Sequence, residues 1–209
     1  MNEQKSKFIY WLIGQGACVA ALNWVRVALD NGATVPELWQ KCERAEWMLW
    51  LMRKCGDIER DVAAQIALEI ARAIWELMPP AGRCAIEMAE AYLRGDAGID
   101  IGRVDSAADA AALVARRATD NATVNAAKAA AMTATVATRT SRVRAVFDAA
   151  FDVELVANRV DRAVSEAAAY GETDVCAAAR RKCADIVRQH IPEMPDIDLE
   201  ADDDDVPPF

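Results

Sequence analysis

The feature that most constrains the fold is an alanine-rich run of 65 residues, from 106 to 170, in which the helical pattern is almost unbroken. At 1.5 Å per residue, a single straight helix of that length would measure about 98 Å. A compact chain of this size is only about 40 to 45 Å across. The run must therefore fold back on itself, and short polar side chains that compete for backbone hydrogen bonds predict breaks at 119–121 and 138–141.

Helix signals continue through the rest of the chain. Thr34 and Glu37 form a capping box around Pro36, which predicts a helix from there to about Cys55. Residues 58–77 carry two apolar stripes, so the helix predicted there is expected to lie centrally. Because only 7 prolines and 9 glycines interrupt the chain, its composition favours helix over sheet. We predict an all-α fold, an antiparallel bundle of about seven to nine helices with an alanine-rich C-terminal half.

Charge divides the chain into a neutral body and an acidic end. Of the 33 acidic residues, eight follow position 192 with no lysine or arginine among them, which leaves 25 acids against 24 bases. We therefore expect a single bundle domain, residues 1–192, and an acidic, flexible tail, residues 193–209. A neutral body argues against a nucleic-acid mimic and against direct binding of nucleic acid.

The cysteines and the N-terminal segment favour a cytoplasmic protein. The six cysteines include no C-x-x-C pair, so they are interpreted as reduced thiols. The apolar run that begins at Phe8 stops at Ile13 and is followed by Gln15, unlike a signal peptide. No apolar stretch reaches the 18 residues of a membrane span, and no membrane contact is expected.

Catalytic residues are scarce. His190 is the only histidine, and its place near the end of the last predicted helix favours a C-terminal cap over a pair with Cys183. The one enzymatic alternative is a Mg-dependent all-α nucleotide pyrophosphohydrolase, which would use two E-x-x-E pairs, Glu43 with Glu46 and Glu87 with Glu90. The pairs lie 40 residues apart without a basic cluster for a triphosphate, so we predict no catalytic residue, no metal and no cofactor.

The stretch CERAEWMLWL, residues 42–51, combines a core stripe with interface residue types. A helix here would bury five residues on one face: Leu38, Cys42, Ala45, Leu49 and Met52. Tryptophan and arginine anchor many protein interfaces because they bury large areas. The alternative is that the tryptophans close the core and that Arg44 bonds an acid on another helix.

Several motifs resemble the Imm5-like family of immunity proteins, which are helical and occur in bacteria and phages. They are W-x-x-C-x-R-x-E-W-M-L-W-L at 39–51, A-I-E at 85–87, Y-L-R-G at 92–95 and C-A-D-I-V-R-x-H-I-P at 183–192. Two features depart from the family pattern. Glu46 stands where aspartate is expected, and the acidic tail is not part of the pattern. The resemblance implies a cytosolic protein that neutralises a toxin by covering its active surface.

We therefore predict a non-catalytic, protein-binding inhibitor whose partner is a toxin or a defence-complex subunit. A phage-encoded, anti-CRISPR-like inhibitor of a bacterial defence complex is the alternative, in which the acidic run occupies a nucleic-acid groove. The predicted partner-binding residues are Arg44, Glu46, Trp47, Trp50, Asp202, Asp203, Asp204 and Asp205.

Overall fold

The computed structural model describes residues 3–55, 58–139, 149–169 and 173–199. Within these ranges the chain forms ten α-helices, one short 3-10 helix and no β-strand. The all-α prediction is confirmed, whereas seven to nine helices is too few. The elements are α1 (Glu3–Gly14), α2 (Val19–Asp30), α3 (Val35–Lys41), α4 (Ala45–Cys55), α5 (Arg60–Ala73), η1 (Trp75–Leu77), α6 (Pro80–Leu93), α7 (Ile101–Arg117), α8 (Asn121–Arg139), α9 (Ala149–Ala168) and α10 (Thr173–His190).

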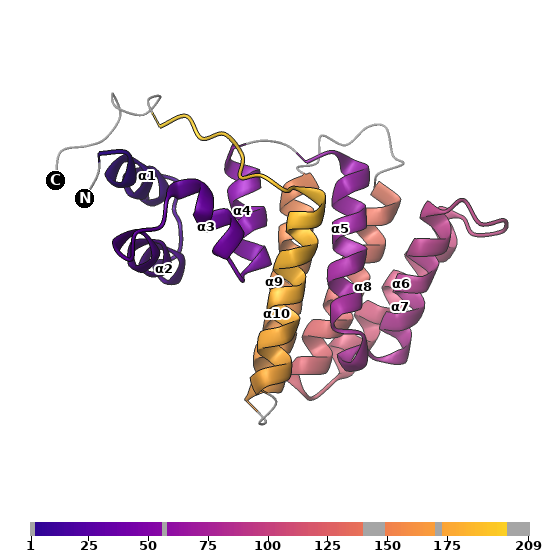
Figure 1. Ribbon diagram of the computed structural model, residues 1–209. Helices are drawn as coiled ribbons and strands as arrows, with labels where there is room; N and C mark the ends of the chain where they lie inside the picture. The colour runs from indigo at the N-terminus through magenta and orange to yellow at the C-terminus, as the bar shows by residue number, and fades with distance from the viewer. Residues whose placement is uncertain (1–2, 56–57, 140–148, 170–172, 200–209) are drawn as a thin grey trace.

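The N-terminal region forms three helices that are grouped on one side of the others (Figure 1). The chain turns between α1 and α2 at Gly16, whose φ of +78° is a left-handed conformation that glycine adopts without a steric penalty. The capping box is present at the start of α3, where the N–H of Thr34 donates to the carboxylate of Glu37 at 2.8 Å.

The single helix predicted from the capping box to Cys55 is instead two helices, because the chain leaves the helical conformation at Cys42. Cys42 has φ −70° and ψ 124°, and carbonyl groups at such a helix end lose their helical partners. The guanidinium of Arg188 on α10 supplies new ones: its Nη1 donates to the carbonyl oxygens of Trp39 at 3.1 Å and Cys42 at 2.7 Å. A distant side chain thus stabilises a break that the local pattern does not predict.

Helix α5 lies centrally, as predicted, and packs against α6, α8, α9 and α10. Its buried residues include Ala63, Ile66 and Ile70, none of which has measurable exposed surface. The helix ends at Ala73 rather than at residue 77, and η1 follows it. Pro80 is the first residue of α6, where its missing N–H leaves no hydrogen bond unmade.

The alanine-rich run folds back as predicted. The break at 119–121 is confirmed, since α7 ends before it and α8 begins at Asn121; the Asp120 carboxylate accepts from the Thr123 N–H at 2.7 Å. The second predicted break, at 138–141, lies largely outside the described residues. Small side chains allow α8 to pack closely against α6, α7 and α9. Fully buried alanines on α8 are Ala126, Ala127, Ala129, Ala130, Ala134 and Ala137.

Residues 191–199, which we call the strap, leave α10 and run past α4 toward α1 without forming a helix or a strand (Figure 1). Four apolar residues of the strap pack against the core: Ile191, Met194, Ile197 and Leu199. The structure therefore places the beginning of the predicted tail against the bundle. In the part of the chain that is described, no helix has the length and apolar character needed to cross a membrane.

Candidate functional site

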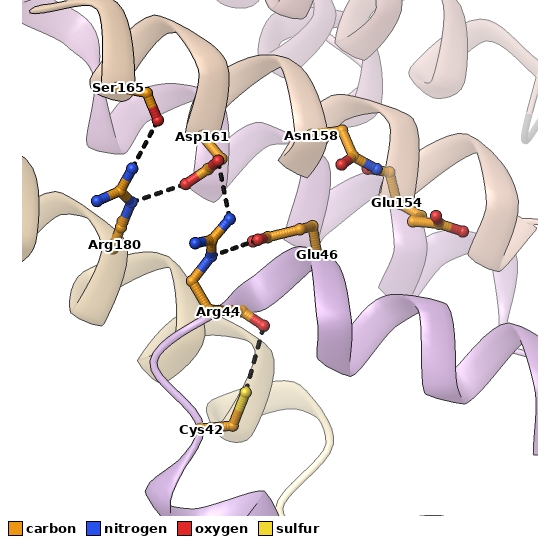
Figure 2. A network of polar contacts seen from close by, with 8 residues as sticks. All are labelled: Cys42, Arg44, Glu46, Glu154, Asn158, Asp161, Ser165 and Arg180. Carbon is orange, nitrogen blue, oxygen red and sulfur yellow. Dashed lines mark hydrogen bonds and ion pairs between the residues drawn. The ribbon is translucent and has the colours of Figure 1, made fainter. Parts of the chain in front are cut away.

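Arg44 lies in the link between α3 and α4, where two carboxylates hold it. Its Nε donates to Glu46, and its Nη2 donates to Asp161 on α9 at 3.0 Å. Asp161 also accepts from Nε of Arg180 on α10 at 2.7 Å. Figure 2 shows these four residues, the charged network, with Arg180 also donating to Ser165 at 2.6 Å. Two guanidinium and two carboxylate groups thus join three parts of the chain that are distant in sequence.

Glu46 is the most buried member of the network, with 8% of its surface exposed. Burial raises the pKa of Glu46, the negative charge of Asp161 raises this pKa further, and Arg44 acts in the opposite direction. The sequence predicts Glu46 as a partner contact. The structure instead places its carboxylate below the surface, where it supports Arg44.

Arg44 also orients one of the predicted interface tryptophans. Its guanidinium carbon lies 4.9 Å from the ring centroid of Trp47, a cation–π distance. Trp24 of α2 packs against the same ring, with centroids 6.1 Å apart. Trp47 and Trp50 are both partly exposed, and the Lys54 ammonium lies 5.9 Å from the ring of Trp50. Charged neighbours on α4 and its preceding link therefore position two aromatic rings at the surface.

The partly exposed tryptophans border an apolar pocket between α1, α2, α3, α4 and the strap, which we call the tryptophan pocket. It is small, because the space that a water-sized group can reach is about 60 Å³. None of the described residues that line it is charged, so it suits an apolar group rather than a charged ligand. The lining consists of Phe8, Leu12, Ala17, Ala21, Trp24, Val25, Leu38, Trp39, Cys42, Trp47, Met48, Trp50, Leu51 and Met194.

The core stripe predicted within this region is confirmed, although the helix is interrupted inside it. All five predicted residues are buried, from Leu49 with no exposed surface to Met52 at 8%. Arg44 bonds an acid on another helix, which is the structural alternative that the sequence left open. Arg44 also contacts Trp47, so the same side chain bonds an acid on another helix and packs on an aromatic ring at the surface.

The two glutamate pairs of the magnesium alternative lie in different places: Glu43 and Glu46 line one pocket with Asp161 and Arg180, whereas Glu87 and Glu90 lie on α6. Glu43 lies in the link before α4, 3.9 Å from Arg181. Glu87 and Glu90 lie on α6, where a carboxylate oxygen of Glu90 is 2.7 Å from Arg72. Among the described residues, no group of three or more histidine, cysteine or acidic side chains is arranged to hold a metal ion. This alternative therefore gains no site from the geometry.

Cys183 and His190 lie in different environments on α10. Burial raises the pKa of Cys183 to about 12, so its thiol remains protonated and poorly nucleophilic near neutral pH. His190 is the last residue of α10, and its Nε2 lies 3.1 Å from a carboxylate oxygen of Glu69 on α5.

Two arginines of α10 pair with acids outside that helix, Arg181 with Glu43 and Arg180 with Asp161. Sequence reasoning also missed Asp161, whose spacing alone carries no signal. For the strap a signal exists, because apolar and acidic residues alternate from 196 to 199. The predicted contacts Asp202–Asp205 lie outside the described residues.

In comparisons with protein-family models, curated proteins and solved structures, no match to this chain is found. The Imm5-like resemblance therefore rests on the sequence motifs. Two of those motifs, at opposite ends of the chain, lie against each other. Arg188 of the second binds the Trp39 carbonyl of the first, and the Trp39 ring N–H donates to the Ile191 carbonyl at 3.0 Å.

Proposed function

We propose that this chain is a non-catalytic inhibitor that acts by binding another protein, with the tryptophan pocket and its rim as the contact surface. The observation that supports this most directly is the pair of partly exposed rings, Trp47 and Trp50, at the edge of an uncharged pocket. Large aromatic side chains around an apolar depression are typical of the centre of protein interfaces.

The charged network supports the same proposal by fixing the surface in place. Arg44 is bonded to Glu46 and Asp161 while it packs on Trp47, so this ring is held before any partner arrives. A preorganised aromatic contact loses less conformational entropy on binding than a mobile one. In this proposal, residues 1–192 form an antiparallel bundle that serves as a rigid scaffold for the contact surface.

The test is partner capture by immobilised full-length protein, followed by affinity measurement with the purified partner. We expect Trp50→Ala to weaken binding by about 30-fold, the effect of an interface hot spot. The matched control is Leu113→Ala, which removes an exposed apolar side chain from α7. Equal affinity of wild type and a folded Trp50→Ala variant would refute the proposal.

The two partner classes are separated by a second experiment on the acidic run. For an immunity protein, coexpression with the toxin restores growth, and a chain without residues 200–209 retains the effect. For an inhibitor of a nucleoprotein defence complex, the run acts as an electrostatic anchor, so its removal weakens binding at low salt and much less at high salt. The toxin role is our first choice because the first of the motifs that resemble immunity proteins, at 39–51, contributes six of the residues that line the tryptophan pocket.

A further inference from the structure

The second half of α1 is apolar around its whole circumference. The six residues from Phe8 to Ile13 are all apolar or aromatic, and six residues make about one and a half turns of an α-helix. Phe8 and Leu12 line the tryptophan pocket, whereas Tyr10 and Ile13 point outward, with 64% and 40% of their surface exposed. A helix that is apolar all round is normally covered on all sides. The outer side of α1 is therefore expected to meet another molecule.

Exposed apolar side chains are concentrated on α1 and its neighbour α2. Among the described residues, seven large apolar side chains are exposed, and four of them belong to these two helices: Tyr10, Ile13, Val19 and Val27. The two helices lie together at one edge of the molecule (Figure 1). An exposed apolar cluster with polar residues beside it is typical of a surface that contacts another protein.

Two opposite charges lie within this cluster. The lining of a shallow pocket between the two helices includes Tyr10 and Ile13 from α1 and Arg26 and Asp30 from α2, and a water-sized group can reach about 200 Å³ of it. Val27 follows Arg26 directly and has 60% of its surface exposed. These five residues together are called the outer face.

The two charges of the outer face are not paired within the chain. Arg26 and Asp30 are exposed, and neither forms an ion pair with another residue in the part of the chain that the structure describes. They are four positions apart on α2, but an acid on the C-terminal side of the base is the less favourable order for pairing along a helix. Asp30 is also the last residue of α2, where the helix dipole disfavours an acid. A cation from another molecule would offset this cost.

We propose that the outer face binds a second copy of this chain around a two-fold axis, with the two α2 helices antiparallel. A two-fold axis makes every contact reciprocal, so Arg26 of each copy lies opposite Asp30 of the other. Val27 of each copy is then covered close to the axis, and Tyr10 and Ile13 flank the charged pairs. The charges favour a second copy as the occupant, because one base and one acid on the same helix complement themselves, whereas a patch of a single sign would fit a different partner.

This dimer goes beyond the proposed function and does not depend on it. On α2, Ala21 and Val25 line the tryptophan pocket, and at 3.6 residues per turn they lie on the side of the helix away from Arg26 and Asp30. Each copy therefore keeps its tryptophan pocket open, and the dimer presents two pockets to partner molecules.

Sedimentation velocity of the full-length chain tests the dimer. Interfaces of ordinary size have dissociation constants of about 1 μM or lower, so wild type should be dimeric at about 100 μM. Arg26→Asp places two acids on the face, and Asp30→Arg places two bases there. Each variant should raise the dissociation constant for self-association by on the order of tenfold or more, because like charges meet across the axis. An equimolar mixture of the two variants should form a heterodimer, since opposite charges again face each other.

A third variant tests the apolar part of the outer face. Val27→Lys should also weaken the dimer, whereas Leu113→Lys, which changes an exposed apolar residue of α7, should leave it intact. Circular dichroism checks that each variant keeps its helices. Monomeric wild type, or a dimer that Arg26→Asp or Val27→Lys leaves unchanged, would overturn the proposal. So would charge variants that remain monomeric when mixed. None of these results bears on the inhibitor role, which is tested separately through Trp50.

Discussion

Arg44 and Asp161 lie 117 positions apart in the chain, yet Nη2 of the arginine is 3.0 Å from a carboxylate oxygen of the aspartate. Asp161 is the centre of the charged network, because it also accepts from Arg180 at 2.7 Å. One carboxylate thus fastens the link before α4 and helix α10 to α9. The position of Trp47, which packs on Arg44, depends on this arrangement.

Replacement of Asp161 by asparagine should destabilise the fold. Asp161→Asn removes the negative charge that two guanidinium groups share, and a lost hydrogen bond to a charged group costs about 1.5 to 3 kcal/mol in the free energy of unfolding. Urea unfolding measures the change. The matched control is Asp96→Asn, which breaks an exposed pair with Arg94 and should leave stability nearly unchanged, because solvent screens such a pair. Similar effects of the two substitutions would contradict this account of the network.

Glu46 should give the protein a characteristic dependence of stability on pH. Because the folded state raises the pKa of Glu46 above 4.5, the folded protein binds this proton more tightly than the unfolded chain does. The contribution of Glu46 to stability should therefore fall as pH rises from about 4.5 through the folded-state pKa. Relative to Glu46→Gln, wild type should be most stable at the acid end of a urea-unfolding series from about pH 4 to about pH 8.

Glu37 provides a control of opposite sign for that experiment. Its hydrogen bond from the Thr34 N–H is the largest of the effects that lower the pKa of Glu37. The contribution of Glu37 to stability should be present above pH 4.5 and should be lost as pH falls through the folded-state pKa of Glu37. For each variant, the measured quantity is the stability difference from wild type as a function of pH. If this difference changes with pH in the same direction for Glu46→Gln as for Glu37→Gln, burial does not dominate the pKa of Glu46.

Arg188 should be essential for the break between α3 and α4. Arg188→Met keeps an apolar stem but leaves the Trp39 and Cys42 carbonyls without their donor, which should reduce the free energy of unfolding by about 2 kcal/mol. Arg181→Met, on the same helix, removes only an exposed pair with Glu43 and should cost about 0.5 kcal/mol or less. Chemical unfolding compares the two variants, and equal losses would rule out the proposed role of Arg188.

The cysteines should differ widely in reactivity. Burial raises the pKa of Cys42 to about 11 and that of Cys183 to about 12, whereas Cys18 and Cys84 are exposed. At about pH 8, alkylation of Cys42 and Cys183 should be slower than that of Cys18 and Cys84 by a factor of roughly 100 or more. Peptide mass spectrometry after timed iodoacetamide treatment gives the rates, and the same reaction in urea is the control in which the difference should vanish. Rapid native labelling of Cys183 would mean that this face of α10 opens.

Local features of the sequence determined much of the helical fold. Alanine content and apolar periodicity identified an all-α chain, and the capping box at Thr34 and Glu37 marked the start of α3. The same periodicity predicted the buried stripe from Leu38 to Met52, even though the helix is interrupted within it. These features are visible in the sequence because helix formation and capping depend on residues within about four positions of one another.

Tertiary structure alone decided the break at Cys42, the partners of Arg44 and Arg180, and the course of the strap. In each case a polar group is satisfied by a residue that is distant in the chain, as when Arg188 binds the Cys42 carbonyl 146 positions away. A sequence pattern shows that such a group needs a partner, but the partner depends on which helices pack together. The sequence by itself therefore determined the helices and the residues that they bury, while the assembled bundle decided which charges meet and which tryptophans remain at the surface.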